Sequence, residues 1–137
     1  MKKYLLLLLL PLQLHALTVT SIVPEYDILQ DLNKYRAKYN LQHVKKDERL
    51  CKLATIRAKQ IQTDWSHKQF YTEIQKTNIG GMFYENLART FEPQDVVWGW
   101  SMSKMGHREA MLIPEMKYGC VKQINKHYSF EGLIPSI

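Results

Sequence analysis

Cysteine is scarce in this chain, and long apolar runs and clustered charges are missing as well. The longest apolar run, residues 4–10, is far shorter than the roughly 20 residues that a membrane-spanning helix needs. Lysine and arginine outnumber aspartate and glutamate by 19 to 13, but they are spread along the chain. No basic stripe alternates with aromatic residues, which argues against nucleic acid as a partner. The 137 residues contain no internal repeat and fit one domain.

The first 16 residues have the layout of a secretory signal peptide. Lys2 and Lys3 give a positive start, residues 4–10 the apolar middle, and Ala16 a small residue at the cut. We predict cleavage within several residues of Ala16, because Leu14, three positions before the cut, is not small. The mature protein is therefore expected to be exported, periplasmic or secreted, without a transmembrane anchor.

The two cysteines, Cys51 and Cys120, leave two interpretations open. Export permits a disulfide between them, and the even count leaves no unpaired thiol. The alternative is that both are small, buried apolar side chains. The sequence does not place their Cα atoms within the roughly 4.4–6.8 Å that a bridge requires.

Apolar residues at steps of three and four predict a helix over residues 25–39, with Asn40 as its C-terminal cap. Lys45 and Lys46 are interpreted as a solvated turn. Asp47 is suited to cap the start of a second helix. The stretch 68–82 is expected to be a mobile connection. The residues on the apolar face of the second helix are Leu50, Ala54, Ala58 and Ile61.

A third helix is predicted to begin near Pro93, which suits a first helical position, and to end at Gly106. Two strand-like runs, residues 117–124 and 127–134, are separated by two residues and predict a hairpin. Helices first and strands late indicate an α+β domain with helices on a small antiparallel sheet. The residues expected to share one face of the third helix are Val96, Val97, Trp100 and Ser103.

Several segments occur in a characteristic order: "LNKYRAKYNL", "LCKLATIRAKQI", "DWSH", "YENLA", "VVWGWSMSKMGHREAML" and "YGCV". In this order they resemble the CAP superfamily, also called the SCP domain, in its short bacterial form. The resemblance covers residues 27–121. It implies an α-β-α sandwich with helices on both faces of the sheet, and a CAP domain over residues 25–137.

The resemblance also implies a central cleft with two histidines and usually two acids. His67 of "DWSH", Glu85 of "YENLA" and His107 of "GHREAML" match three of these positions. The fourth falls on Ser103, which removes a negative charge. Tyr84 stands where the family commonly has glycine. The residues expected to line the cleft beside the matched ones are Ser103, Tyr84 and Trp100.

Two imidazoles and a carboxylate are a workable ligand set for zinc or another divalent metal, with a position left for water. We therefore predict His67, His107 and Glu85 as metal ligands. No HExxH spacing adds support. Taken alone, each histidine is more simply a surface or capping group, and Glu85 a salt-bridge or helix-capping residue.

A hydrolase is an alternative. Ser103 and His107 are four residues apart, which on a continuous helix would place them on the same face. Glu85 could then orient His107 and complete a serine–histidine–acid set. However, Gly106 interrupts that helix, and no GxSxG elbow is present. We expect a non-enzymatic protein that binds a metal ion, a small ligand or an envelope component. The alternatives are metal-assisted or serine-type hydrolysis of peptide or cell-envelope bonds, and lipid or sterol binding.

The remaining large side chains are expected to be structural. The tryptophans interpreted as packing residues are Trp65, Trp98 and Trp100. The arginines expected to be fixed by salt bridges or carbonyl groups inside the domain are Arg36, Arg57 and Arg108.

Overall fold

The computed structural model describes residues 25–137, so the predicted signal peptide at residues 1–16 lies outside the described part. The helices are α1 (Ile28–Ala37), α2 (Glu48–Gln60), α3 (Lys68–Gln75), α4 (Asp95–Ser101) and α5 (His107–Met111). The strands are β1 (Lys45–Lys46), β2 (Gly81–Arg89), β3 (Tyr118–Ile124) and β4 (His127–Pro135). Within residues 25–137, no helix has the length and apolar character needed to cross a membrane.

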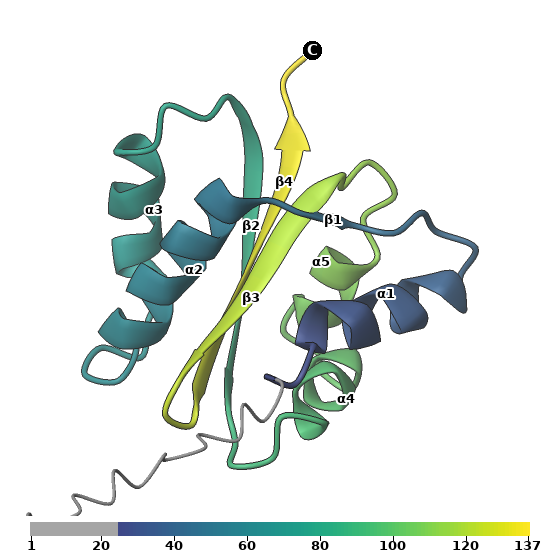
Figure 1. The fold of residues 1–137 in the computed structure, drawn as a ribbon, viewed down its shortest axis with the longest axis horizontal. Helices are drawn as coiled ribbons and strands as arrows, with labels where there is room; N and C mark the ends of the chain where they lie inside the picture. The colour runs from purple at the N-terminus through teal and green to yellow at the C-terminus, as the bar shows by residue number, and fades with distance from the viewer. Residues whose placement is uncertain (1–24) are drawn as a thin grey trace, which may run out of the picture.

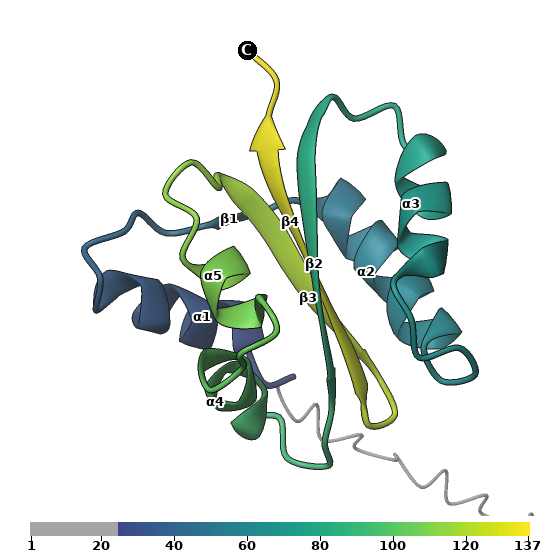
Figure 2. The same cartoon turned by 180° about the vertical axis from the view of Figure 1, so that it is seen from behind.

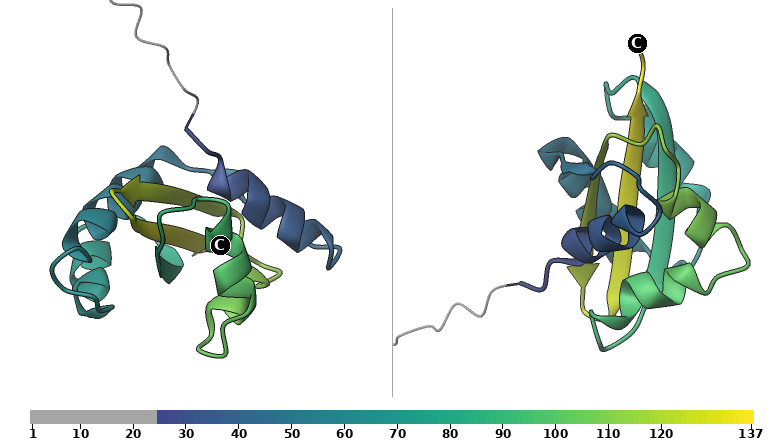
Figure 3. Two further views of the ribbon diagram at one scale, coloured as in Figure 1. Left: turned by 90° about the horizontal axis from the view of Figure 1, so that it is seen from below. Right: turned by 90° about the vertical axis from the view of Figure 1, so that its right-hand side faces the viewer.

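Helices cover both faces of the sheet: α2 and α3 lie on one side, and α1, α4 and α5 on the other (Figures 1 and 2). Figure 3 shows the same layers from below and from the side. This arrangement confirms the predicted α+β class and the α-β-α sandwich. The strand order is β1-β3-β4-β2, with β4 antiparallel to both neighbours and β1 parallel to β3.

Strand β4 is the centre of the domain, since both of its faces are covered. Tyr128 and Phe130 pack in the core beneath α1 and α4. Ser129 and Glu131 alternate with them along the strand, so their side chains point to the opposite face, which α2 covers, and both are fully buried. The predicted hairpin between β3 and β4 is confirmed. Its turn residue Asn125 has a φ of 54°, a left-handed conformation that asparagine adopts more easily than most residues.

Helix α2 is joined to the sheet by the disulfide between Cys51 and Cys120, whose Cα atoms lie 5.0 Å apart. This decides between the two interpretations of the cysteines in favour of a bridge. Leu50 and Leu133 pack around it. The predicted cap at the start of α2 is confirmed as well, because the side chain of Asp47 accepts a hydrogen bond from the backbone N–H of Arg49.

Arg36 is fixed as predicted. It is fully buried, and its guanidinium donates to the carbonyl groups of Gln42, Met111 and Ile113, which ties α1 to the end of α5. The same prediction was wrong for Arg108. Its guanidinium instead lies over the ring of Tyr39, 5.6 Å from the ring centre.

The prediction of a mobile connection over residues 68–82 was wrong, because this stretch contains α3 and the start of β2. Phe70 is the one buried residue of α3, and a helix that buries so little apolar surface has only a weak apolar repeat in its sequence. Lys45 and Lys46 form β1 rather than a free turn. The backbone N–H of Lys45 donates to the carbonyl of Lys117, and both lysine side chains stay exposed.

The third helix is shorter than predicted. It ends at Ser101, and Gly106 precedes α5 in a left-handed conformation instead of ending α4. Serine side chains compete with helical hydrogen bonding at this point: the hydroxyl of Ser101 donates to the carbonyl of Trp98, and that of Ser103 accepts from the N–H of Met105. Ser103 therefore does not continue the buried face of α4.

Candidate functional site

A buried ion pair joins α2 to the edge strand β2. Arg57 Nε lies 2.6 Å from Glu85 Oε2, and Nη2 lies 3.1 Å from Oε1. Both side chains are almost completely shielded from solvent, at 0% and 1% exposure. The other guanidinium donors bond to Gln60 Oε1 at 2.7 Å and to the carbonyl of Ser66 at 2.7 Å. The salt bridge that was one prediction for Arg57 and for Glu85 is thus present. The alternative prediction, that Glu85 caps a helix, was wrong, because Glu85 lies within strand β2.

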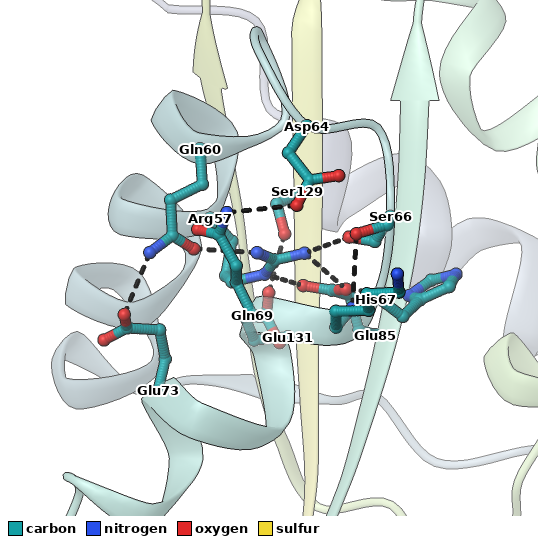
Figure 4. Close-up of polar contacts among 11 residues, drawn as sticks. Arg57, Gln60, Asp64, Ser66, His67, Gln69, Glu73, Glu85, Ser129 and Glu131 are labelled. Carbon is teal, nitrogen blue, oxygen red and sulfur yellow. Dashed lines mark hydrogen bonds and ion pairs between the residues drawn. The ribbon is translucent and has the colours of Figure 1, made fainter.

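His67 lies beside this pair at the start of α3, and its ring points away from Arg57 (Figure 4). Its Nδ1 is 2.8 Å from Glu85 Oε1. We assign the proton to Nδ1, because a carboxylate held by Arg57 accepts hydrogen bonds and donates none. The ring is half-exposed. Nε2 is therefore left as the outward-facing nitrogen of a ring whose orientation is fixed.

Glu131 adds a second carboxyl group behind Glu85. The two residues are direct partners in the β2–β4 register, and Ser129 donates a hydrogen bond to Glu131 Oε1 at 2.6 Å. Burial first, and then the negative charge of Glu85, raise the pKa of Glu131 well above its ordinary value, despite the opposing effects of Ser129 and Arg57. We conclude that Glu131 is held as the neutral acid, because Arg57 already pairs with Glu85 and no lysine or arginine among residues 25–137 forms an ion pair with Glu131.

Replacing Glu131 by glutamine is expected to stabilise the protein at alkaline pH. The pKa of Glu131 is higher in the folded chain than in the unfolded chain, so the folded state binds more protons between the two values and stability falls as pH rises through that window. Glutamine removes this penalty. Melting temperatures measured from about pH 4 to pH 8 should show a gain for E131Q that grows with pH.

Exposed Glu115 supplies the control for this measurement, since E115Q makes the same chemical substitution at a side chain that is not buried. Identical pH profiles for E131Q and E115Q would contradict the neutral-acid assignment.

His107, the second predicted histidine, begins α5, which lies on the opposite face of the sheet from α2 and α3 (Figure 1). Its backbone carbonyl accepts a hydrogen bond of 2.9 Å from Asn86, the residue after Glu85 on β2. Burial, and next the charge of nearby His67, lower the pKa of His107, with Glu109 opposing them. Both effects favour the neutral ring of His107, in which one nitrogen carries the proton and the other keeps a lone pair.

The predicted site residues lie in two neighbouring hollows. His67, Glu85 and Tyr84 line one of about 390 Å³, and His107 and Trp100 line another of about 490 Å³. Ser103 lines neither. Trp100 is buried and donates to the carbonyl of Leu87 at 2.8 Å, which confirms its packing role. Trp65 and Trp98 are instead 50% and 65% exposed, so the prediction that they are packing residues was wrong.

Glu131 and Ser129 were missed by the sequence analysis. The signal for them is the alternation in "HYSFEGLI", where Tyr128 and Phe130 mark one buried face and leave Ser129 and Glu131 on the other. A glutamate in such a strand has to find a partner or stay protonated. The sequence does not reveal that Glu85 is its neighbour, because that depends on the β2–β4 register.

The chain matches the family model of the cysteine-rich secretory protein family, CAP, over residues 29–130. The match covers most of the chain, and the chain therefore belongs to the CAP family. No curated protein sequence matches it.

Three solved structures have the same fold. An extracellular SCP-domain protein from Bacillus anthracis is 22% identical, with a TM-score of 0.71, and the match covers 77% of this chain and 38% of that one. A cysteine-rich secretory protein from Staphylococcus aureus is 14% identical, with a TM-score of 0.69, and 36% of it is covered. An outer surface protein from Borrelia burgdorferi is 22% identical, with a TM-score of 0.67, and 90% of it is covered. This chain thus spans little more than a third of the first two proteins.

Proposed function

We propose that this chain is an exported CAP-domain protein that binds a divalent metal ion through the imidazoles of His67 and His107, without catalysing a reaction. The observation that carries the proposal is the chain of contacts from Arg57 through Glu85 to His67 Nδ1, which fixes a half-exposed ring with Nε2 outward. Export is supported by the Cys51–Cys120 bridge, because disulfides persist in oxidising compartments.

The donor chemistry agrees with a metal such as zinc. A metal-binding histidine almost always donates its other ring N–H to a carboxylate or carbonyl, and Glu85 holds His67 in this way. The lowered pKa of His107 favours the neutral form that binds metals. Zinc, when bound, would supply a Lewis acid with exchangeable water positions.

The role of Glu85 differs from that of a ligand. Both of its oxygens are engaged by Arg57, and one of them also by His67. In residues 25–137, no group of three histidine, cysteine, aspartate or glutamate side chains is placed to hold a metal ion together. We therefore propose a site with two imidazole donors, completed by water, in which Glu85 orients His67.

A serine-type hydrolase is less well supported. The hydroxyl of Ser103 accepts a hydrogen bond from its own turn, at Met105 N–H. Glu85 orients His67 rather than His107, so the described contacts do not join a serine, His107 and an acid.

Zinc titration by calorimetry tests the metal proposal. His67→Ala and His107→Ala should each weaken binding by about tenfold or more, because each removes one of two protein donors. Glu85→Gln should weaken it by about 10- to 100-fold, as expected for a group that orients a ligand. His43→Ala is the matched control, since His43 is exposed in the connection between α1 and β1. Unchanged zinc affinity in the His67→Ala, His107→Ala double variant would disprove the site.

A further inference from the structure

The hollow beside His107 has a lining that the metal proposal does not use. It lies along the end of edge strand β2, between α4 and the connection that follows α2. Its volume of about 490 Å³ falls within the roughly 300–1,000 Å³ of small-molecule sites. The residues that line it and carry the argument below are Trp65, Arg89, Thr90, Asp95, Trp98 and Gly99.

Two exposed indoles face this hollow from different elements. Trp98 comes from α4 and is 65% exposed, and Trp65 comes from the connection after α2 and is 50% exposed. Trp65 is held in place, with the guanidinium of Arg89 5.4 Å from its ring centre and the ring of His127 at 6.1 Å. Two large aromatic rings left in water on the walls of one hollow are characteristic of a binding surface.

Polar groups line the hollow together with the two indoles. Asp95 lies in the first turn of α4. It forms no ion pair with any residue from 25 to 137. Arg89 stacks on Trp65 and likewise pairs with no carboxylate in the described part of the chain. Arg89 and Asp95 together give the hollow hydrogen-bond donors and acceptors with no net charge.

Gly99 leaves part of the wall of the hollow open. It lies inside α4, where glycine is less stable than alanine by roughly 0.5–1 kcal/mol. A Cβ atom added at Gly99 would meet no atom within 4 Å, so neither packing nor backbone conformation requires glycine here. The missing side chain instead lets a ligand approach the helix backbone between Trp98 and Trp100.

We propose that this hollow binds a segment of an uncharged glycan chain. A sugar ring has an apolar C–H face, which fits against an indole, and a rim of hydroxyl groups, which fits the donors and acceptors of Arg89, Thr90 and Asp95. Because Arg89 and Asp95 together give the hollow no net charge, phosphate or a charged peptide is a less suitable ligand. Because both indoles and the open wall at Gly99 belong to a hollow that His67 does not line, this inference goes beyond the metal site.

Calorimetric titration with chitotetraose and cellotetraose, in the presence of EDTA to exclude metal, tests the proposal. The full chain should bind at least one of them and show a change in tryptophan fluorescence. Trp98→Ala should weaken binding by about tenfold or more, as expected for an aromatic anchor. Gly99→Leu should abolish binding by placing a side chain in the hollow, and the variant should fold, because leucine favours helix more than glycine does.

Phe91→Ala is the matched control, since Phe91 is another exposed aromatic side chain, 80% exposed, that does not line the hollow. It should bind like the parent chain, as should His67→Ala, which separates this test from that of the metal site. Absence of binding to both sugars, or unchanged affinity in Trp98→Ala and Gly99→Leu, would overturn the proposal. Binding of decanoate or adenosine alone, in a manner sensitive to Trp98→Ala, would overturn the assignment to a saccharide.

Discussion

Replacement of Arg57 by alanine is expected to lower the free energy of unfolding by about 3–5 kcal/mol, because it leaves a buried charge without its partner. Glu85 is 1% exposed and loses both of its bonds to the guanidinium. The carbonyl of Ser66 and the amide of Gln60 lose donors at the same time. Urea unfolding followed by circular dichroism measures the loss of stability. The ring of His67 should also become less ordered, because its partner Glu85 is no longer held by Arg57.

Arg49 provides a control on the same helix. Its Nη2 lies 2.6 Å from Asp47 Oδ2, the same distance as in the buried pair, but its side chain is 61% exposed. Arg49→Ala should therefore leave the unfolding midpoint almost unchanged, since water screens and replaces an exposed ion pair. If both variants lose the same stability, burial is not what makes the Arg57 pair important.

Removal of the disulfide, by the double change Cys51→Ala and Cys120→Ala, is expected to cost about 4 kcal/mol. The bridge closes a loop with a sequence separation of 69 residues, and it links α2 to β3 across the core. Opening a loop of this length increases the conformational freedom of the unfolded chain. Guanidinium unfolding of the oxidised parent and the double variant gives the difference.

The oxidised and reduced forms of the parent chain serve as the control for the substitutions themselves. The reduced parent should unfold close to the double variant, and the oxidised parent at clearly higher denaturant. Equal midpoints for all three forms would show that loop closure contributes nothing to stability.

The first two helices and the hairpin were read correctly from the sequence. The spacing of Leu29, Leu32 and Tyr35 gave α1, and Asp47 gave the start of α2. The two alternating runs around Asn125 gave the hairpin. These features are encoded locally, because amphipathic periodicity, capping and turn conformation depend on residues close together in the chain.

Strand β2 was not predicted, for a reason that also concerns the site. Glu85 and Asn86 interrupt its apolar pattern, and both are satisfied by partners far away in the sequence: Arg57 and the carbonyl of His107. A polar residue inside a strand looks unfavourable until that partner is known. The family resemblance gave the residues His67, Glu85 and His107, but it did not show that Glu85 would be held by Arg57.

The sequence by itself determined the family, the α+β class, the main helices, the hairpin and the identity of the candidate histidines. Only the tertiary structure decided that Cys51 and Cys120 are bonded, that Glu85 orients His67, that Glu131 is buried beside Glu85, and that Trp65 and Trp98 face one hollow. The physical reason is that protonation, ion pairing and exposure depend on neighbours brought together by strand register and helix packing, which no local pattern encodes.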